Sequence, residues 1–311
     1  MISVYVDSGA NIPAVYVEKY GINVIPFVNL VDGKEVTGFE PGLTEEEERQ
    51  KGKEYYDSIR NGAKVSTSLI NTGTFEEIFE KELAAGNDVI YIAISSGISG
   101  TYNAARAACE ELKEKYPDRE VYAVDSMNAS LASGIPAIYA TELAAKGVGA
   151  GKIAQLLTDA APYMNGVFTV GDLKYLANTG RISGVAAFAG NVLNIKPILK
   201  GNSQGFIVQV KKMRGRKKAV DELSKLILDN IIEPEKQILG IAHADAYEES
   251  LEVMEKVQEK VKVRDFINTS YDFCTGSHVG PDTIAVFFMG YDRELSGESE
   301  GYKRPELFEY L

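Results

Sequence analysis

The sequence has few of the residues that build disulfide frameworks and metal sites. It holds two cysteines, Cys109 and Cys274, and two histidines, His243 and His278, among 311 residues. The cysteines are far apart and lack a second pair, so they support neither a disulfide framework nor a zinc site, and we expect both to be small buried side chains. The histidines show no metal-ligand spacing, so no metal is expected.

Long apolar runs are absent as well. No stretch of about 18 apolar residues occurs, and the first residues, MISVYVDSGA, lack the basic region and the apolar run of a signal peptide. We therefore expect a cytoplasmic protein. The net charge of −12 disfavours nucleic acid and anionic lipid surfaces as partners, because both attract basic proteins.

One basic run, KKMRGRKK at 211–218, stands out in this acidic chain. It is either a contact for phosphate, a membrane surface or an acidic partner, or a solvated strand end and helix start. A transient membrane contact stays open as well.

The length and the order of the predicted elements indicate an α/β protein with two domains. A chain of 311 residues is about twice the usual length of one domain. In the first half, apolar runs alternate with helical segments, which predicts a parallel sheet with strands at 2–6, 23–27, 89–94 and 121–124. The second half predicts a mixed sheet with helices on one face. We place the domains at 1–162 and 163–290, followed by a loosely attached C-terminal extension, 291–311.

Two local motifs add detail to the first domain. Asp32 and Gly33, between apolar stretches, predict a hairpin that could cover a cleft. Thr74 and Glu77 predict a capping box at the start of a helix that Gly86 ends.

Short polar residues follow three of the predicted strands. They are Asp7-Ser8, the loop from Ser95 to Thr101, and Asp125-Ser126, with Ser66-Thr67-Ser68 in a fourth loop. Ligands of open parallel sheets bind beyond the carboxyl ends of the strands, and the 95–101 loop leads into a helix whose N–H groups favour an anion. These positions predict a carboxylate or phosphate site. The alternative is that the residues only cap helices and form turns.

Known enzyme motifs find little support. The segment 147–152 resembles a nucleotide loop, but it follows a helix and has Ile153 where Ser or Thr would hold magnesium. The serine of Gly97-Ile98-Ser99-Gly100 lacks the spacing of a hydrolase elbow. His243 is expected to be structural. His278, in a predicted Gly/Pro loop, is the histidine that we expect to face a ligand.

Together these motifs resemble the DegV family. The resemblance is carried by Val6-Asp7-Ser8, Thr67-Ser68, the segment SSGISGTYN at 95–103, Val124-Asp125-Ser126, Gly180-Arg181-Ile182-Ser183 and His278-Val279-Gly280-Pro281. It spans residues 1–290 and implies a Rossmann-like N-terminal domain, a C-terminal α/β domain, and a fatty acid bound between or beneath them. It also implies that the chain is the lipid-binding subunit of a bacterial fatty acid kinase in phospholipid metabolism. A separate ATP-binding subunit would then phosphorylate the carboxylate, and this chain alone would not be catalytic.

The resemblance assigns roles to individual residues. Thr67 and Ser96 would bind the carboxylate, with Ser95 as the alternative to Ser96, and His278 would stand beside the same head group. Arg181 would lie near the opening, where its charge could stabilise an acyl phosphate or meet the kinase subunit; otherwise it forms a surface salt bridge.

The chain departs from the family pattern at two places. The family usually has Thr-Ser-Gln-Pro where this chain has Thr67-Ser68-Leu69-Ile70, and a second glycine where it has Asp282. The loop after Ser68 is therefore expected to sit differently.

A fatty acid also requires an apolar tunnel. The segment 184–195 is apolar on nearly every helical face and either lines such a tunnel or fills a core. No cofactor is expected beyond the bound lipid. Two alternatives stay open: a hydrolase or an acyl or phosphoryl transferase in which Ser96 or Ser99 works with His278, and a carrier of another lipid acid. Chain length, unsaturation, the partner subunit and oligomeric state are not specified by the sequence.

Overall fold

The computed structural model describes residues 1–182, 194–291, 293 and 303–311, and two β-sheets organise this part of the chain. The first sheet is parallel and has four strands in the order β2-β1-β6-β7. Its strands are β1 (Ile2–Asp7), β2 (Asn23–Ile25), β6 (Asp88–Ala93) and β7 (Val121–Asp125). All four coincide with apolar runs of the sequence, so the predicted parallel sheet is confirmed.

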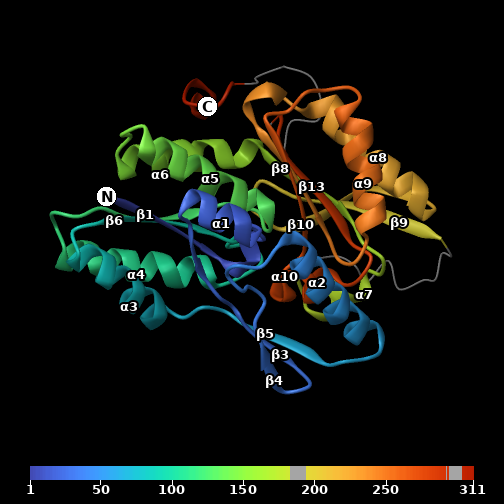
Figure 1. The fold of residues 1–311 in the computed structure, drawn as a ribbon, viewed down its shortest axis with the longest axis horizontal. Coiled ribbons are helices and arrows are strands. Elements are labelled where there is room, and N and C mark those ends of the chain that lie inside the picture. Colours follow the sequence, from blue (N-terminus) through green and yellow to red (C-terminus); the bar gives the residue numbers. More distant parts are fainter. Residues whose placement is uncertain (183–193, 292, 294–302) are drawn as a thin grey trace.

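Helices cover both faces of this sheet, as Figure 1 shows. On one face lie α3 (Thr72–Ala84) and α4 (Thr101–Lys115); on the other lie α5 (Leu131–Ala145) and α6 (Ala150–Ala160), while α1 (Ala14–Tyr20) packs beside α5. The predicted capping box at Thr74 is wrong. The helix begins earlier, at Thr72, because Asn71 Oδ1 accepts a hydrogen bond from the Thr74 N–H at 3.0 Å.

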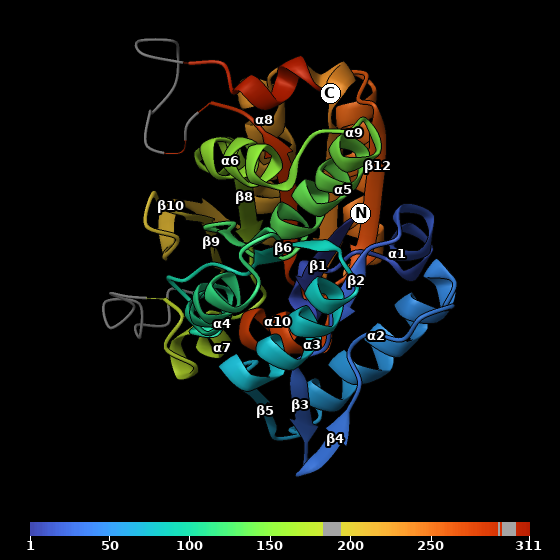
Figure 2. The ribbon, with the colours of Figure 1, turned by 90° about the vertical axis from the view of Figure 1, so that its left-hand side faces the viewer.

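A small antiparallel sheet projects from the first half of the chain (Figure 2). It consists of β3 (Val28–Val31), β4 (Lys34–Val36) and β5 (Val65–Ser68) in the order β4-β3-β5. Asp32 and Gly33 form its tight turn with φ of 49° and 78°, so the predicted hairpin is confirmed. The helix α2 (Glu45–Arg60) connects β4 to β5. Residue Asn29 of β3 pairs with Thr67 of β5, so the hairpin supports the strand that carries Thr67.

The second sheet is mixed, as predicted, with strand order β10-β9-β8-β13-β11-β12. Its strands are β8 (Met164–Thr169), β9 (Ile195–Gly201), β10 (Ile207–Arg214), β11 (Ile238–His243), β12 (Asp265–Ser270) and β13 (Ile284–Met289). The helices α8 (Arg216–Asn230) and α9 (Tyr247–Gln258) pack on one face. On the other face α5 contacts β11, β13 and β8, so the two sheets share a core.

Two short helices adjoin the second sheet and lie side by side in Figure 1 and Figure 2. They are α7 (Lys174–Asn178) and α10 (Phe273–Val279). Gly280, with φ of 79°, ends α10 and lets the Tyr175 ring approach, because a Cβ at this position would lie 2.1 Å from that ring. The contact holds α7 against α10.

The C-terminal extension packs on the molecule where it is described, so the expected loose attachment is wrong for residues 303–311. Leu307 and Phe308, in a short 3-10 helix (Glu306–Glu309), are buried against α6. The Lys236 ammonium donates a hydrogen bond to the Phe308 carbonyl at 2.7 Å.

The domain boundaries at 162 and 290 stay a prediction. Among the described helices, none combines the length and apolar character needed to cross a membrane.

Candidate functional site

A cavity of about 690 Å³ opens where the ends of both sheets meet. Its wall combines β5, the loops after β6 and β7, strands β8 and β13, the β9–β10 turn, α7 and α10. Apolar side chains from both halves line it: Ile94, Ile98, Phe168, Leu176, Ile207, Val279 and Phe287. The volume lies within the usual range for small-molecule sites, and the lining suits an apolar ligand.

Thr67 and His278 form a hydrogen-bonded pair on the wall of this cavity. The Thr67 hydroxyl lies 3.1 Å from His278 Nε2, and which of the two donates depends on the tautomer of the ring. The prediction that His278 sits in a loop is wrong. It lies in the last turn of α10, because Asp272 caps this helix by accepting hydrogen bonds from the N–H groups of Cys274 and Thr275 at 3.0 and 2.8 Å.

His278 is neutral at pH 7. Burial, together with the positive charge of Arg181, lowers its pKa from 6.5 to about 4. Its Nδ1 is buried and has no hydrogen-bond partner within the described part of the chain. The ring can therefore face a polar ligand group without carrying a full charge of its own.

The loop between β6 and α4 brings Ser96 to the cavity. Ser96 is exposed and lines the opening, and its N–H donates to Asp125 Oδ1 at 3.2 Å. Ser99 also lines the cavity, but its hydroxyl is hydrogen-bonded to the Thr101 hydroxyl at 2.9 Å. Ser96 thus has the side chain that is available to a ligand, whereas Ser99 is occupied within the loop.

The structure gives Ser95 a different position from its neighbour. Its buried hydroxyl donates to the Gly205 carbonyl at 3.0 Å and accepts from the Gly97 N–H at 3.0 Å. It is not among the residues that line the cavity. Ser95 therefore joins this loop to the β9–β10 turn, and the structure does not support it as the alternative to Ser96.

Arg181 follows α7 and lines the cavity. Its Nη1 donates to the Thr179 carbonyl at 2.5 Å. Its charge is near enough to lower the pKa of His278 and to oppose the rise that burial causes in the pKa of Cys274.

Both cysteines are buried and free, as predicted, and burial raises the pKa of Cys274. Residues 184–193 of the apolar helix predicted at 184–195 lie outside the described residues, and the prediction is wrong at its end, because Ile195 begins β9.

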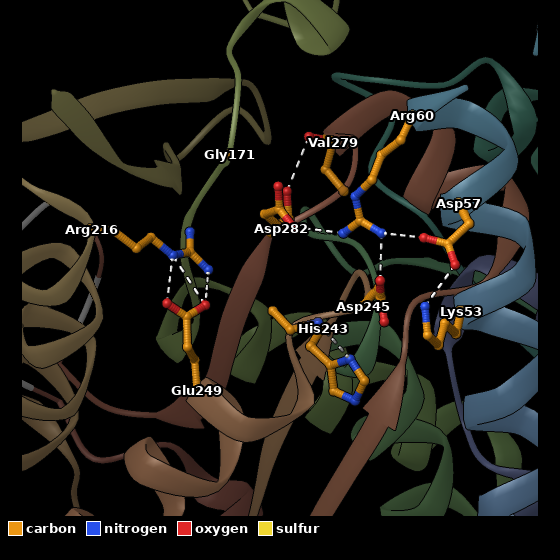
Figure 3. Close-up of polar contacts among 12 residues, drawn as sticks. Lys53, Asp57, Arg60, Gly171, Arg216, His243, Asp245, Glu249, Val279 and Asp282 are labelled. Atoms are coloured by element: carbon orange, nitrogen blue, oxygen red, sulfur yellow. Dashed lines mark hydrogen bonds and ion pairs between the residues drawn. The ribbon is translucent and has the colours of Figure 1, made fainter. Parts of the chain in front are cut away.

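The two departures from the family pattern have structural counterparts. Leu69 is 53% exposed at the cavity, and Ile70 beneath it is buried. Asp282 has φ of 63°, in the left-handed region that favours glycine. Its carboxylate accepts a hydrogen bond from Arg60 at 2.6 Å, and Figure 3 shows the same guanidinium reaching Asp245. Arg60 therefore ties α2 to the segment that follows α10.

The other polar strand ends support the loops and do not face the cavity. Asp7 is fully buried and accepts hydrogen bonds from the Tyr91 hydroxyl at 2.7 Å and the Ile94 N–H at 3.0 Å. Burial raises the pKa of Asp7 to about 6 and that of Asp272 to about 7. Asp125 accepts from the N–H groups of Ser96 and Met127. These carboxylates shape the loops that hold Ser96.

His243 is buried at the end of β11, and the position agrees with the expected structural role. Its Nδ1 accepts a hydrogen bond from the Ala246 N–H at 3.4 Å, and burial lowers its pKa to about 4.

Sequence reasoning missed several cavity residues, among them Asn128, Tyr271 and Thr275. Asn128 lies two residues after a strand-end serine that the sequence had singled out, which is the one signal that pointed to it.

Comparison with known proteins identifies the family. The family model described as "Uncharacterised protein, DegV family" matches residues 1–290. The chain belongs to the DegV family. A DegV domain-containing protein from Clostridium perfringens is 34% identical over 94% of this chain and 98% of its own length.

Solved structures of DegV proteins share the fold. The structure of DegV, a fatty acid binding protein from Bacillus subtilis, has a TM-score of 0.78 and 28% identity, and covers 93% of this chain and 99% of that one. A Thermotoga maritima protein whose structure is described as revealing fatty acid binding function has a TM-score of 0.75, with 28% identity and the same two coverages. The predicted α/β architecture, with a parallel-sheet N-terminal part and a mixed-sheet C-terminal part, is that of the DegV family.

Proposed function

We propose that this chain binds a long-chain fatty acid, with the acyl tail in the cavity and the carboxylate at its polar end. The observation that carries the proposal is one continuous cavity of about 690 Å³ whose apolar wall includes the Thr67–His278 pair. The fatty acid binding described for the B. subtilis and T. maritima proteins supports it.

The carboxylate would be held by Thr67, Ser96 and His278. A carboxylate removed from water has to regain hydrogen bonds, and hydroxyl groups can supply them without a full counter-charge. Thr67 and Ser96 offer such hydroxyls on the cavity wall. His278 can add a ring N–H, and the charge of Arg181 would favour an anion beside it.

The tail would supply most of the binding free energy. At about 0.8 kcal/mol per methylene, roughly 14 methylenes contribute on the order of 11 kcal/mol before the costs of association. The head-group residues would then mainly set the position of the carboxylate.

We further propose that the bound acid is presented to a separate ATP-dependent kinase subunit, which converts the carboxylate to an acyl phosphate. The exposure of Ser96 at the cavity supports this, because a carboxylate beside it stays within reach of a partner. Arg181 would stabilise the added phosphate charge or contact the partner. In this scheme the chain itself has no catalytic residue and requires no cofactor other than its lipid.

The serine-centred enzyme gains no support. A serine nucleophile needs a base within hydrogen-bond distance. In the part of the chain that the structure describes, no hydrogen bond joins His278 to Ser96 or Ser99; Nε2 contacts Thr67 instead. We therefore prefer the binding function.

The basic run at 211–218 is partly neutralised. Lys211 pairs with Glu222 at 2.6 Å, and Arg216 with Glu249 at 2.6 Å, a pair that Figure 3 also shows. These pairs favour the solvated-segment interpretation, and a transient membrane contact stays a prediction.

Native mass spectrometry of the purified protein, followed by extraction and identification of the released ligand, tests the proposal. We expect a fatty acid at near one per chain. A protein that carries none and cannot be loaded with fatty acids of any length would refute fatty-acid binding. Incubating the loaded protein with a kinase subunit and ATP, and measuring acyl phosphate, tests the second step separately.

A further inference from the structure

Two carboxyl groups are buried close behind the wall of the cavity. Asp7, at the end of β1, is fully buried, and Asp272, which caps α10, is only 6% exposed. Their hydrogen bonds come from uncharged groups, namely the Tyr91 hydroxyl and backbone N–H groups. Neither carboxyl pairs with a lysine or arginine among the residues that the structure describes. A buried carboxyl without a cation keeps its proton to a higher pH than an exposed one.

The two carboxyls lie close to each other, beside Thr275. The Thr275 N–H donates to Asp272 Oδ1 at 2.8 Å. A Cβ added to Gly9 would lie 3.0 Å from the Thr275 hydroxyl and 2.9 Å from Asp7 Oδ1, so these two oxygens border the same small space. Burial is the main reason that the pKa of Asp272 is raised to about 7, and the nearby charge of Asp7 adds to it. The two groups therefore titrate as a coupled pair.

The helix α10 connects this pair to the proposed head-group site. Cys274 and Thr275 line the cavity, and His278 lies one helical turn after Thr275. At a rise of about 1.5 Å per residue, Asp272 and His278 are about 9 Å apart along the helix axis. The Cys274 thiol is near both ends of this path: beyond the effect of burial, its pKa is raised by the charge of Asp272 and lowered by that of Arg181. An anion beside His278 is thus close enough to raise the pKa of Asp272 further, because charges inside a protein are screened less than in water.

The other titratable groups around the pair keep one charge state between pH 6 and pH 9. Burial raises the pKa of each hydroxyl or thiol that faces the carboxyls, so all of them stay uncharged: Tyr55, Tyr56, Tyr91, Tyr271 and Cys274. His278 is neutral because its pKa is about 4, and the Arg181 guanidinium is always charged. A proton that binds near the head group in this pH range therefore goes to the two carboxyls.

We propose that Asp272 and Asp7 together take up a proton when the fatty acid binds, so that the carboxylate enters without adding a net negative charge to the buried site. The bound anion favours a protonated carboxyl nearby, and by linkage the protonated carboxyl favours the anion to the same extent. The affinity is therefore highest where Asp272 is protonated, and it falls as pH rises. This inference rests on the proposed fatty-acid binding and adds two residues to its head-group site.

The first test measures proton uptake by the unaltered protein, with titration calorimetry in two buffers of different ionisation enthalpy. The ligands are tetradecanoic acid, below the concentration at which it aggregates, and tetradecanol, which has the same chain and no charge. Above pH 6 the free acid is already ionised. We expect uptake of about half a proton per acid at about pH 7.5, and a dissociation constant about tenfold higher at about pH 9 than at about pH 6. Tetradecanol should bind without proton uptake and equally well at both pH values.

The second test is the variant Asp272→Asn, with Glu48→Gln as its matched control. Asparagine can still cap α10 through its side-chain oxygen. Burial also raises the pKa of Glu48 to about 7, and its carboxyl accepts a hydrogen bond from the Ala14 N–H at 2.9 Å, but it does not line the cavity. Asp272→Asn should lose most of the proton uptake and bind the acid about tenfold more tightly than the parent at about pH 9. Glu48→Gln should keep the uptake and the pH dependence of the parent.

The outcomes separate this inference from the function on which it rests. Binding of the acid without proton uptake, uptake that tetradecanol also causes, or uptake that Asp272→Asn keeps or Glu48→Gln loses overturns the role of the two carboxyls while leaving fatty-acid binding intact. Failure of fatty acids of every length to bind refutes the proposed fatty-acid binding itself. If Asp272→Asn fails to fold, the comparison of acid with alcohol on the unaltered protein and on Glu48→Gln still decides the question.

Discussion

Thr67→Val is the sharpest test of the proposed head-group site. Valine keeps the branched shape of threonine on β5 and removes only the hydroxyl. In the structure this hydroxyl lies 3.1 Å from His278 Nε2, at the point where the carboxylate is expected. The substitution therefore deletes one hydrogen bond to the anion and leaves the apolar cavity unchanged.

The size of the effect follows from the balance between head group and tail. A hydrogen bond to a charged group contributes about 1.5–3 kcal/mol to binding, so its loss should raise the dissociation constant roughly tenfold to hundredfold. The tail keeps its contribution of roughly 11 kcal/mol. We expect the variant to copurify with fatty acid, to bind it more weakly in competition, and to lose more of its acyl phosphate formation than of its lipid occupancy.

Occupancy by native mass spectrometry and affinity by competition with a fluorescent fatty acid check this prediction. Thr141→Val is the matched control, because the Thr141 hydroxyl is bonded to the Ile138 carbonyl on α5 and does not line the cavity. A dissociation constant for Thr67→Val equal to that of the control would show that Thr67 does not hold the carboxylate. An empty but folded variant would show that the tail does not dominate binding.

Three further predictions concern stability. The pKa of Asp272 is raised to about 7, so the folded state retains a proton that the unfolded state loses above pH 4. This carboxyl therefore lowers the free energy of unfolding as pH rises from about 4 to 7. Urea titrations should show that Asp272→Asn becomes more stable relative to the parent across that pH range. A difference in unfolding free energy between variant and parent that does not change with pH would contradict the raised pKa. Gly205→Ala places a Cβ 2.0 Å from Ser95 Oγ at φ of 75° and should lower the free energy of unfolding by more than about 2 kcal/mol. Its control, Gly62→Ala, has φ of 93° and open space around the added Cβ, so it should lower the free energy of unfolding by only about 1–2 kcal/mol through backbone strain. Equal midpoints in thermal unfolding would refute the Ser95–Gly205 link. Phe308→Ala should cost about 3–5 kcal/mol by the same measurement, because the ring is fully buried, and a loss below about 1 kcal/mol would show that the extension is dispensable.

The sheets and the hairpin could be predicted because strong local signals specify them. Buried parallel strands require continuous apolar runs, and a two-residue turn with positive φ requires residues such as Asp32 and Gly33. The helix α10 was missed because it has only seven residues, contains Gly276 and includes no strong helix former. Its start depends on the cap at Asp272, a signal that is weak without knowledge of the tertiary contacts.

The sequence indicated where the candidate site lies better than it indicated which side chains face the ligand. Polar strand ends indicated the right edge of the sheet, but neighbouring side chains diverge there. Ser96 faces the cavity, whereas Ser95 turns to the β9–β10 turn, a contact across 110 residues of sequence. Asp7 carries the same signal and is buried among backbone N–H groups. Only the packing of the two sheets decides which of these groups meets a ligand.

The aspartate at position 282 has an energetic consequence. An L-residue at φ of 63° costs about 1–2 kcal/mol relative to glycine, whereas its largely exposed ion pair with Arg60 returns about 0–1 kcal/mol. The ion pair therefore offsets only part of the backbone cost, so aspartate at this position carries a net cost of up to about 2 kcal/mol relative to glycine. Arg60 keeps Asp245 as a second partner in either case. At this position the aspartate of this chain exchanges the backbone freedom of glycine for a charged link between α2 and the segment that follows α10.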